Sequence, residues 1–285
     1  MIDFASNVLD ELAEDVDYSI VGPRDSRVHE VDTTRFPFNT VCHVERDFGD
    51  GRWRGCSGTL IGPRTVLTAG HCLYNHMLRR APARVRIIPG RRDRDTKPFG
   101  AIPAARCYVA RGYIARGRGS IAARVAARRD ADYGVVVLER PIAGIRRFMT
   151  VQAPTEADIA RIRSRKLLTI AGYPGDRPIG TMWRHAERLA EVTPRRLFYT
   201  VDTCPGHSGS AIWYRRLGGD ERVIIGVHTS GVVDEQGRSF GCSPGTVMAP
   251  GGMRNSGVRL TTEIVANIRN PARIVGGLPA MARVR

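Results

Sequence analysis

Asp202-Thr203-Cys204-Pro205-Gly206-His207-Ser208-Gly209-Ser210 is the stretch from which the rest of the chain is interpreted. Ser208 is its candidate nucleophile, and the loop backbone can supply two donors for an oxyanion and one wall of a specificity pocket. A serine hydroxyl is a poor nucleophile at neutral pH, so it needs a base within hydrogen-bond reach and a third group that orients this base. The loop therefore implies a histidine and an acid elsewhere in the chain.

A histidine and an aspartate upstream meet this requirement. His71 lies in Leu67-Thr68-Ala69-Gly70-His71-Cys72, and Asp132 opens the apolar run Asp132-Tyr133-Gly134-Val135-Val136-Val137-Leu138. Asp130 is a rival acid on the same side of any strand, but the apolar run begins directly after Asp132. The order histidine, aspartate, serine excludes an α/β-hydrolase, which runs serine, acid, histidine and needs glycine where this chain has Ser210.

Length and composition indicate a globular protein. The 285 residues, 42% of them hydrophobic, suit two packed β-barrels that share one site, and a monomer is expected. The sequence contains no run of about 18 apolar residues, so no membrane span is predicted. The remaining histidines show no zinc-ligand spacing, so neither a metal nor a cofactor is expected. They are His29, His43, His76 and His185.

The net charge of +16 comes almost entirely from arginine, since only Lys97 and Lys166 are lysine. A basic surface can attract nucleic acid or anionic polymers. No nucleic-acid fold motif or series of stacking aromatics accompanies the charge, so we favour arginine on solvated loops and expect no specific nucleic-acid partner.

Short apolar segments bounded by glycine and proline predict β-strands from residue 39 onward. The predicted strands of a first barrel are 39–45, 53–61, 65–68, 84–88, 106–109 and 133–138. Those of a second barrel are 167–172, 181–183, 188–192, 197–201, 210–214, 223–229 and 256–260. A helix at 261–268, capped by Thr261 or Thr262, closes the fold, and the tail 272–285 is expected to be loose.

Six cysteines allow 15 pairings if all are bridged. Cys56 with Cys72 would staple the segments that flank the candidate base. Cys204 precedes Ser208, and Cys242 lies in the segment expected to face it. Cys42 with Cys107 remains by elimination. Three bridges indicate an oxidising compartment.

The N-terminus differs sharply from the basic body, because residues 1–18 carry acidic side chains and no basic one. We interpret this segment as a propeptide or its remnant; a solvated extension is the alternative. The first residues lack the basic start and apolar core of a signal peptide, so an export signal is not visible in this sequence.

Several stretches together resemble one protein family, the serine endopeptidases of the trypsin and chymotrypsin superfamily, and within it the secreted bacterial glutamyl endopeptidases. The matching stretches are 19–22 with 24–28, 61–72, 172–176, 180–183 and 202–210. The resemblance implies an all-β, chymotrypsin-like fold of two packed six-stranded antiparallel β-barrels with a C-terminal helix. It also implies a secreted enzyme that acts on protein or peptide substrates.

The resemblance implies a role for each candidate residue. His71 takes the Ser208 proton and returns it to the leaving amine, while Asp132 orients the imidazole and stabilises its charged form. The backbone N–H groups of Gly206 and Ser208 form the oxyanion hole. Position 207 departs from the trypsin pattern, because His207 stands where trypsin-like zymogens keep the aspartate that pairs with a new N-terminus.

The glutamyl endopeptidases lack that aspartate as well and bring their mature N-terminus towards the acidic side chain of the substrate. By analogy, activating cleavage is expected near residues 19–21. The family binds this carboxylate with a histidine at the His228 position and a threonine like Thr203, and Thr229 and Ser230 complete the predicted pocket. A histidine offers a donor, and a cation when protonated.

The resulting hypothesis is a zymogen-derived serine endopeptidase that cleaves after Glu, less often after Asp. Trypsin-like cleavage after Arg or Lys through Asp202 is the alternative specificity, and a catalytically silent, anion-binding relative is the alternative class. The expected divisions are a propeptide or extension (1–19), a first barrel with His71 and Asp132 (20–145), a second barrel with Ser208 (146–260), and a C-terminal helix and tail (261–285).

Overall fold

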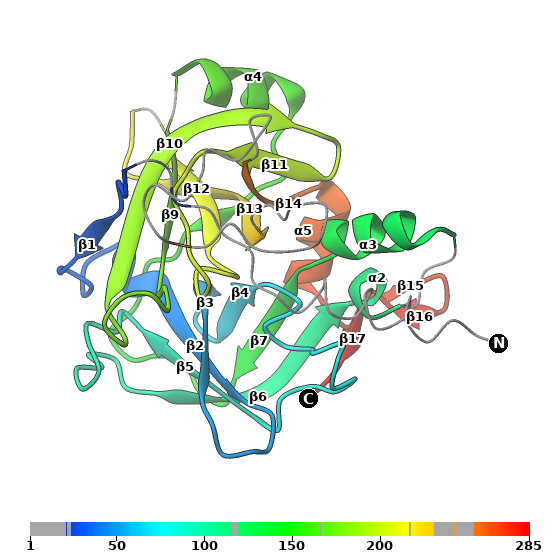
Figure 1. Cartoon of the computed structure of the whole chain (residues 1–285), viewed down its shortest axis with the longest axis horizontal. Helices are drawn as coiled ribbons and strands as arrows, with labels where there is room; N and C mark the ends of the chain where they lie inside the picture. Colours follow the sequence, from blue (N-terminus) through cyan, green and yellow to red (C-terminus); the bar gives the residue numbers. More distant parts are fainter. Residues whose placement is uncertain are drawn as a thin grey trace.

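The structure is a computed structural model that describes residues 21, 24–115, 119–165, 167–216, 218–230, 242 and 254–285. It consists of two barrels, with barrel two and helix α4 (Glu156–Arg165) above barrel one in Figure 1. The predicted all-β fold of two closed six-stranded antiparallel barrels is confirmed. The acidic segment 1–19 lies outside the described residues.

Barrel one closes because strand β6 pairs with both β5 and β7. Its strands are β2 (Val41–Asp47), β3 (Arg54–Gly62), β4 (Thr65–Thr68), β5 (Arg84–Pro89), β6 (Ile102–Ala110) and β7 (Gly134–Leu138). The 3₁₀ turn η1 (Phe38–Thr40) leads into β2, and helices α2 (Arg111–Ile114) and α3 (Ile121–Asp130) connect β6 to β7. The loop after β4 and the start of β7 therefore meet at one end of the barrel.

Barrel two closes in the same way, because β9 pairs with both β10 and β12. Its strands are β9 (Leu167–Gly172), β10 (Met182–Val192), β11 (Arg196–Tyr199), β12 (Ala211–Arg215), β13 (Arg222–Ser230) and β14 (Asn255–Arg259). Two short strands extend this sheet: β1 (Val28–Glu30) pairs with β10, and β8 (Thr150–Val151) pairs with β13. The predicted strands fall on the observed ones, apart from their ends and β10.

Strand β10 is one continuous strand where the sequence predicts two. Most of its residues are only half-buried, so the chain shows no clear alternation of apolar and polar residues between 183 and 187. The strand is held instead by its pairing with β9, which runs from Trp183↔Gly172 to Arg188↔Leu167. Backbone pairing across the sheet thus outweighs a weak local pattern.

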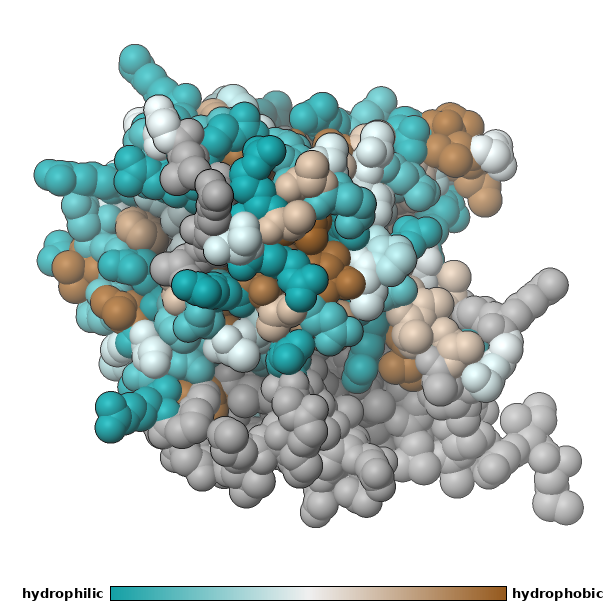
Figure 2. Space-filling model, turned by 90° about the horizontal axis from the view of Figure 1, so that it is seen from above, coloured by the Kyte–Doolittle hydropathy of each residue, from teal (hydrophilic) through white to brown (hydrophobic). Residues whose placement is uncertain are grey.

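Helix α5 (Thr262–Arg269) begins as predicted, with the Thr261 hydroxyl accepting a hydrogen bond from Ile264 N at 3.2 Å. The described residues contain no helix that is both long and apolar enough to cross a membrane. The face seen in Figure 2 is mostly hydrophilic, with small separate hydrophobic patches, as expected for a surface in water.

The predicted loose tail is wrong, because the last residues form strands. After the hairpin of β15 (Ile274–Val275) and β16 (Leu278–Pro279), strand β17 (Met281–Arg283) pairs with β6 of barrel one. Strand β5 pairs with β6 only at Ile102 and Pro103, and β17 pairs with β6 further along, at residues 108–110. The Met281 side chain is fully buried.

Two of the three predicted cysteine pairs are bonded in the structure, Cys56–Cys72 and Cys204–Cys242. The predicted Cys42–Cys107 bridge is wrong, because both residues are buried free thiols. They lie on β2 and β6, which are separated by β5 and hence by about 10 Å, whereas a disulfide needs Cα atoms within about 7 Å. Burial raises the pKa of both thiols, that of Cys107 to about 12.

We expect Met281→Ala to destabilise the protein by about 3 kcal/mol, because it removes a fully buried side chain from the strand that completes the β6 edge. Urea unfolding measured in a Ser208→Ala background, which avoids self-digestion, checks this value. Ile274→Ala is the control, since that side chain is exposed. Equal free energies of unfolding for both variants would contradict the packing of the tail.

Thiol titration tests the corrected cysteine pairing. The unreduced protein should show two reactive thiols per chain in denaturant and none in the native state, because Cys42 and Cys107 are buried and their pKa values are raised. Absence of thiols in the unreduced, denatured protein would restore the third bridge.

Candidate active site

Three separate elements bring the predicted catalytic residues together where the barrels meet. His71 follows β4, Asp132 precedes β7, and Ser208 precedes β12. Strand β4 pairs with β7 up to Thr68↔Gly134, so the segments that continue from this pair lie side by side.

Two hydrogen bonds join His71 to Asp132. The ring Nδ1 lies 2.8 Å from Asp132 Oδ2, and the backbone N–H of His71 donates to Oδ1 at 2.9 Å. The carboxylate thus fixes both the ring and the loop that carries it. Asp130, the rival acid, is the last residue of α3, and burial raises its pKa. Asp132 is therefore the residue placed to orient the histidine.

Ser208 is fully buried and fixed by its backbone. Its carbonyl accepts a hydrogen bond from Ser57 N at 2.8 Å and lies 3.6 Å from Cys72 Sγ, next in the chain to His71. Its Oγ has no hydrogen-bond partner among the described residues, and its backbone N–H donates to none of their acceptors. An unpaired buried hydroxyl beside an unpaired amide is typical of a site that awaits a ligand.

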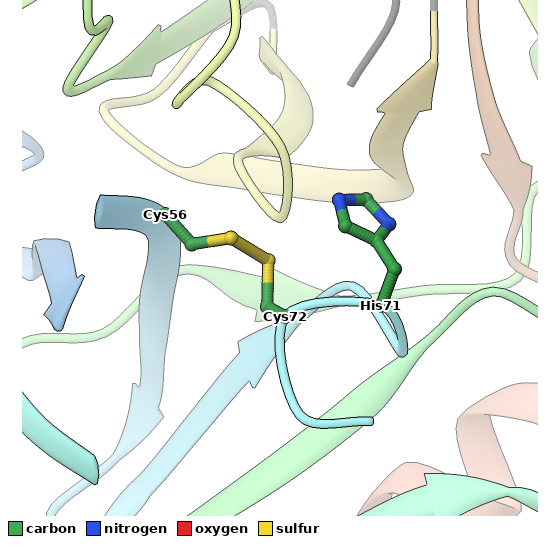
Figure 3. Close-up of side chains that lie close together, drawn as sticks. All are labelled: Cys56, His71 and Cys72. Carbon is green, nitrogen blue, oxygen red and sulfur yellow. A yellow bond between two sulfur atoms is a disulfide. The ribbon is translucent and has the colours of Figure 1, made fainter. Parts of the chain in front are cut away.

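The Cys56–Cys72 disulfide lies next to His71 (Figure 3). Within the described part of the chain, Cys56, His71 and Cys72 are the one group of potential metal ligands that lie close together. Metal ions bind cysteine as a thiolate, and both sulfur atoms are bonded to each other. This donor set therefore does not fit a metal ion, and the disulfide instead anchors the loop that carries His71.

The loop before Ser208 requires glycine at two positions. Gly206 has φ +102°, and a Cβ atom there would lie 2.5 Å from Tyr173 O. Gly209 has φ +88°, and its Cβ would lie 2.2 Å from Ser57 O. The Ser57 hydroxyl donates to Gly206 O at 2.7 Å and accepts from Tyr173 N at 2.9 Å. Ser57 thus fixes the backbone of the predicted oxyanion loop.

His228, the histidine of the predicted pocket, has a fully buried side chain. The Tyr199 hydroxyl lies 2.6 Å from His228 Nδ1. Two buried pocket atoms, His228 Nε2 and Thr203 Oγ1, have no well-formed hydrogen bond within the described residues. Burial holds the pKa of His228 well below its usual value, and the nearby His207, His71 and Arg196 lower it further. The surroundings of His228 therefore disfavour its protonated form.

Asp202, the acid of the alternative specificity for Arg or Lys, binds groups of the protein itself. Its Oδ2 accepts a hydrogen bond from Ser26 N at 2.8 Å and lies 3.5 Å from His185 Nδ1. The carboxylate is buried, and its own backbone N–H donates to His185. Asp202 thus holds the N-terminal segment against β10 rather than standing open for a substrate cation.

His207 confirms the expected departure from the trypsin pattern at this position, because it offers no carboxylate. Burial lowers its pKa to about 4, and Arg27 contributes. Its Nδ1 accepts a hydrogen bond from Cys204 N at 3.1 Å. A neutral imidazole therefore fills the site where a trypsin-like zymogen keeps its activating aspartate.

An ion network that the sequence did not single out lies near this site. Arg27 is fully buried and binds Asp25 and Asp176, each through two of its nitrogens, at 2.6–2.9 Å; Arg177 also binds Asp25. The neighbouring Gly175 N donates to Pro205 O at 2.7 Å. The network therefore connects the N-terminal segment to the loop that holds the predicted oxyanion donors. In the sequence, the charged residues of opposite sign at 24–27 are the one hint of this network.

Arg27→Gln should lower the stability by about 3 kcal/mol, because it removes the fully buried guanidinium from two partly buried carboxylates, which keep only the half-buried Arg177. It should also lower kcat/KM, through release of the loop at 173–178. Urea unfolding in the Ser208→Ala background and peptide hydrolysis by the active chain measure the two effects. Arg24→Gln, which removes the same charge from an exposed side chain, should change neither.

The same pair of variants has a pH signature. The Arg27 hydrogen bonds lower the pKa of Asp25 from 3.8 to about 2, so the stabilisation is complete above pH 3.8. The difference in stability between wild type and Arg27→Gln should shrink as the pH falls from about 4 to 2. A difference that is constant over this range would argue against the ion network.

Comparison with known proteins places this geometry in a family. Residues 26–245 match the family model described as Trypsin. The glutamyl endopeptidase of Bacillus licheniformis is 28% identical over 255 residues, which cover 88% of this chain and 68% of that protein. An extracellular metalloprotease of Bacillus subtilis is 25% identical over 252 residues, covering 88% and 69% of the two chains.

Comparison with solved structures also finds proteases of the same fold. A Glu endopeptidase in complex with MPD has a TM-score of 0.65 and 26% identity and covers 88% of this chain and 98% of its own. The protease Anisep from Arthrobacter nicotinovorans has a TM-score of 0.59 over 86% of this chain and 97% of its own; at 15% identity it supports the fold alone.

Proposed function

Because the chain belongs to the trypsin family and is a serine endopeptidase, we propose that it cleaves proteins after Glu, less often after Asp, through an acyl-enzyme on Ser208. The observation that carries this proposal is a group of three buried polar atoms that have no well-formed hydrogen bond among the described residues. They are Ser208 Oγ, Thr203 Oγ1 and His228 Nε2. A substrate carbonyl beside the first atom and a side-chain carboxylate beside the other two would satisfy all three.

The His71–Asp132 pair supplies the base for the proposed chemistry. Ser208 Oγ has no hydrogen-bond partner among the described residues, so its hydrogen bond to His71 would form when substrate binds. Ser208 Oγ attacks the scissile carbonyl carbon while His71 takes the hydroxyl proton. His71 then donates this proton to the leaving amine, the C–N bond breaks, and the acyl group stays on Ser208. A water molecule, deprotonated by His71, hydrolyses the ester. Asp132, 2.8 Å from Nδ1, stabilises the imidazolium that forms twice in this cycle.

The oxyanion of each tetrahedral intermediate is assigned to the backbone N–H groups of Gly206 and Ser208. The Ser208 N–H, which donates to no acceptor among the described residues, supports this assignment. So does the hydrogen bond from Gly175 N to Pro205 O, which orients the peptide group that carries the Gly206 N–H. One such donor contributes about 3–4 kcal/mol to transition-state stabilisation in comparable enzymes. Gly206 and Gly209 give the loop the two positive φ angles that it needs.

Specificity for Glu is assigned to His228 and Thr203, with Thr229 and Ser230 as the adjoining wall. The Tyr199 hydroxyl has no partner among the described residues other than His228 Nδ1. If it donates to Nδ1, the neutral ring keeps its proton on Nε2 and can donate it to a carboxylate. Related glutamyl endopeptidases support an acidic substrate residue, and the engagement of Asp202 by Ser26 disfavours Arg or Lys.

The remaining assignments follow from this function. A catalytically silent relative is disfavoured by the intact His71–Asp132 pair.

Two disulfides support secretion into an oxidising compartment, where residues 1–19 would serve as the propeptide of a zymogen. We assign His71 and Asp132 to a domain at 20–145 and Ser208 to a domain at 146–260, followed by the helix and tail at 261–285.

Cleavage-site profiling of a denatured protein mixture tests the proposal. Cuts should follow Glu, and Ser208→Ala should reduce turnover by about 10⁶-fold, since the nucleophile is lost. The purified chain and the Ser208→Ala variant are compared with and without removal of residues 1–19. Serine-dependent cuts after Arg would transfer specificity to Asp202, and no Ser208-dependent cuts in either form would refute the proposed function.

A further inference from the structure

Arg196, the first residue of β11, places a buried guanidinium directly behind the predicted pocket wall. One of its terminal nitrogens donates to Arg129 O at 2.6 Å, and the other lies within 3.2 Å of three hydroxyls. These belong to Thr229 (3.2 Å), Ser230 (3.1 Å) and Ser256 (2.6 Å). Arg196 therefore touches β13, β14 and the end of α3, which lies beside these strands in Figure 1.

This cation has no direct ion pair in the described part of the chain. In the part of the chain that the structure describes, no carboxylate lies within 4 Å of the Arg196 guanidinium; its partners are three neutral hydroxyls and one carbonyl. Burial lowers its pKa, while Tyr199, Asp132 and Asp130 act in the opposite direction. An arginine remains charged in proteins even so. A buried charge without an ion pair is costly unless a ligand supplies the opposite charge.

His228 is poorly suited to supply a positive charge to the pocket. Burial holds its pKa well below its usual value, and Arg196 is one of the groups that disfavour its protonation. The electrostatic field of Arg196 therefore reaches the His228 ring. A field that disfavours an added proton at this place favours a bound carboxylate there by the same electrostatics.

We infer that Arg196 determines specificity by supplying the fixed positive charge that favours an acidic P1 side chain, with Thr229 and Ser230 between the guanidinium and the substrate. The inference rests on the proposed cleavage after Glu. His228 and Thr203 give the carboxylate its hydrogen bonds, and Arg196 gives it its counter-charge. Arg196 makes no contact with the reacting atoms and is not a catalytic residue.

Peptides that differ only in P1 Glu or P1 Gln isolate this effect, because the two side chains have nearly the same shape and differ in charge. The ratio of kcat/KM for the Glu peptide to kcat/KM for the Gln peptide is measured for wild type and for Arg196→Gln. We expect the ratio to fall at least about tenfold in the variant, with the loss confined to the Glu peptide. A merely structural role would lower both values equally, which would overturn the inference.

Arg188→Gln is the matched control. It removes the same charge from an exposed position on β10, so the Glu/Gln ratio should stay at the wild-type value. An equal fall of the ratio in both variants would assign the preference to the overall charge of the protein and would also overturn the inference.

A measurement on wild type decides the question even if Arg196→Gln does not fold. Arginine stays charged throughout, so the Glu/Gln ratio should be constant from pH 6 to 9. The titratable groups facing Arg196 are Asp130, Asp132 and Tyr199, with His228 behind the same wall. A ratio that falls around pH 6.5 would assign the charge to a histidine. A fall around pH 8 would assign it to a free α-amino group.

The two hypotheses fail differently. If wild type prefers Gln to Glu or does not distinguish them, the proposed specificity is wrong and the inference falls with it. If wild type prefers Glu and Arg196→Gln keeps that preference undiminished, only the role of Arg196 is wrong.

Discussion

The contacts of Ser57 with the nucleophile loop hold the two halves of the site together. Ser57 belongs to β3 of barrel one, yet its backbone N–H binds Ser208 O and its hydroxyl binds Gly206 O and Tyr173 N, all in barrel two. Its carbonyl accepts from the Thr68 hydroxyl, close to His71 in the chain. One serine that carries no charge and does no chemistry thus links the loop of the nucleophile to the strand that leads to the base.

Charge is distributed around this site in an unusual manner. The two buried histidines nearest the nucleophile loop, His207 and His228, are neutral because burial lowers their pKa values. The buried cations are arginines: Arg27 is matched by two carboxylates, and Arg196 has none within ion-pair distance in the described residues. An arginine keeps its charge where a buried histidine does not, so the charges of these four buried side chains do not change with pH in the neutral range.

Short-range residue patterns in the sequence predicted the elements that depend on nearby residues. The Thr261 cap, the strands of both barrels and the loop around Ser208 follow from residue patterns of short range. Other features depend on partners far away in sequence. Asp202 binds a backbone group 176 residues upstream, and nothing near Cys42 reveals that β5 separates it from Cys107. Arg196 could not be told from the many exposed arginines, because its burial is created by β13, β14 and α3 together.

Strand β17 gives the chain an order of assembly. It occupies the part of the β6 edge that β5 leaves unpaired, and Cys107 N and O bind the last two residues of the chain. During synthesis, this edge stays open until residues 281–285 have emerged, which is after all the strands of both barrels. The barrel that carries His71 and Asp132 is thus completed only after the barrel that carries Ser208 has been synthesised.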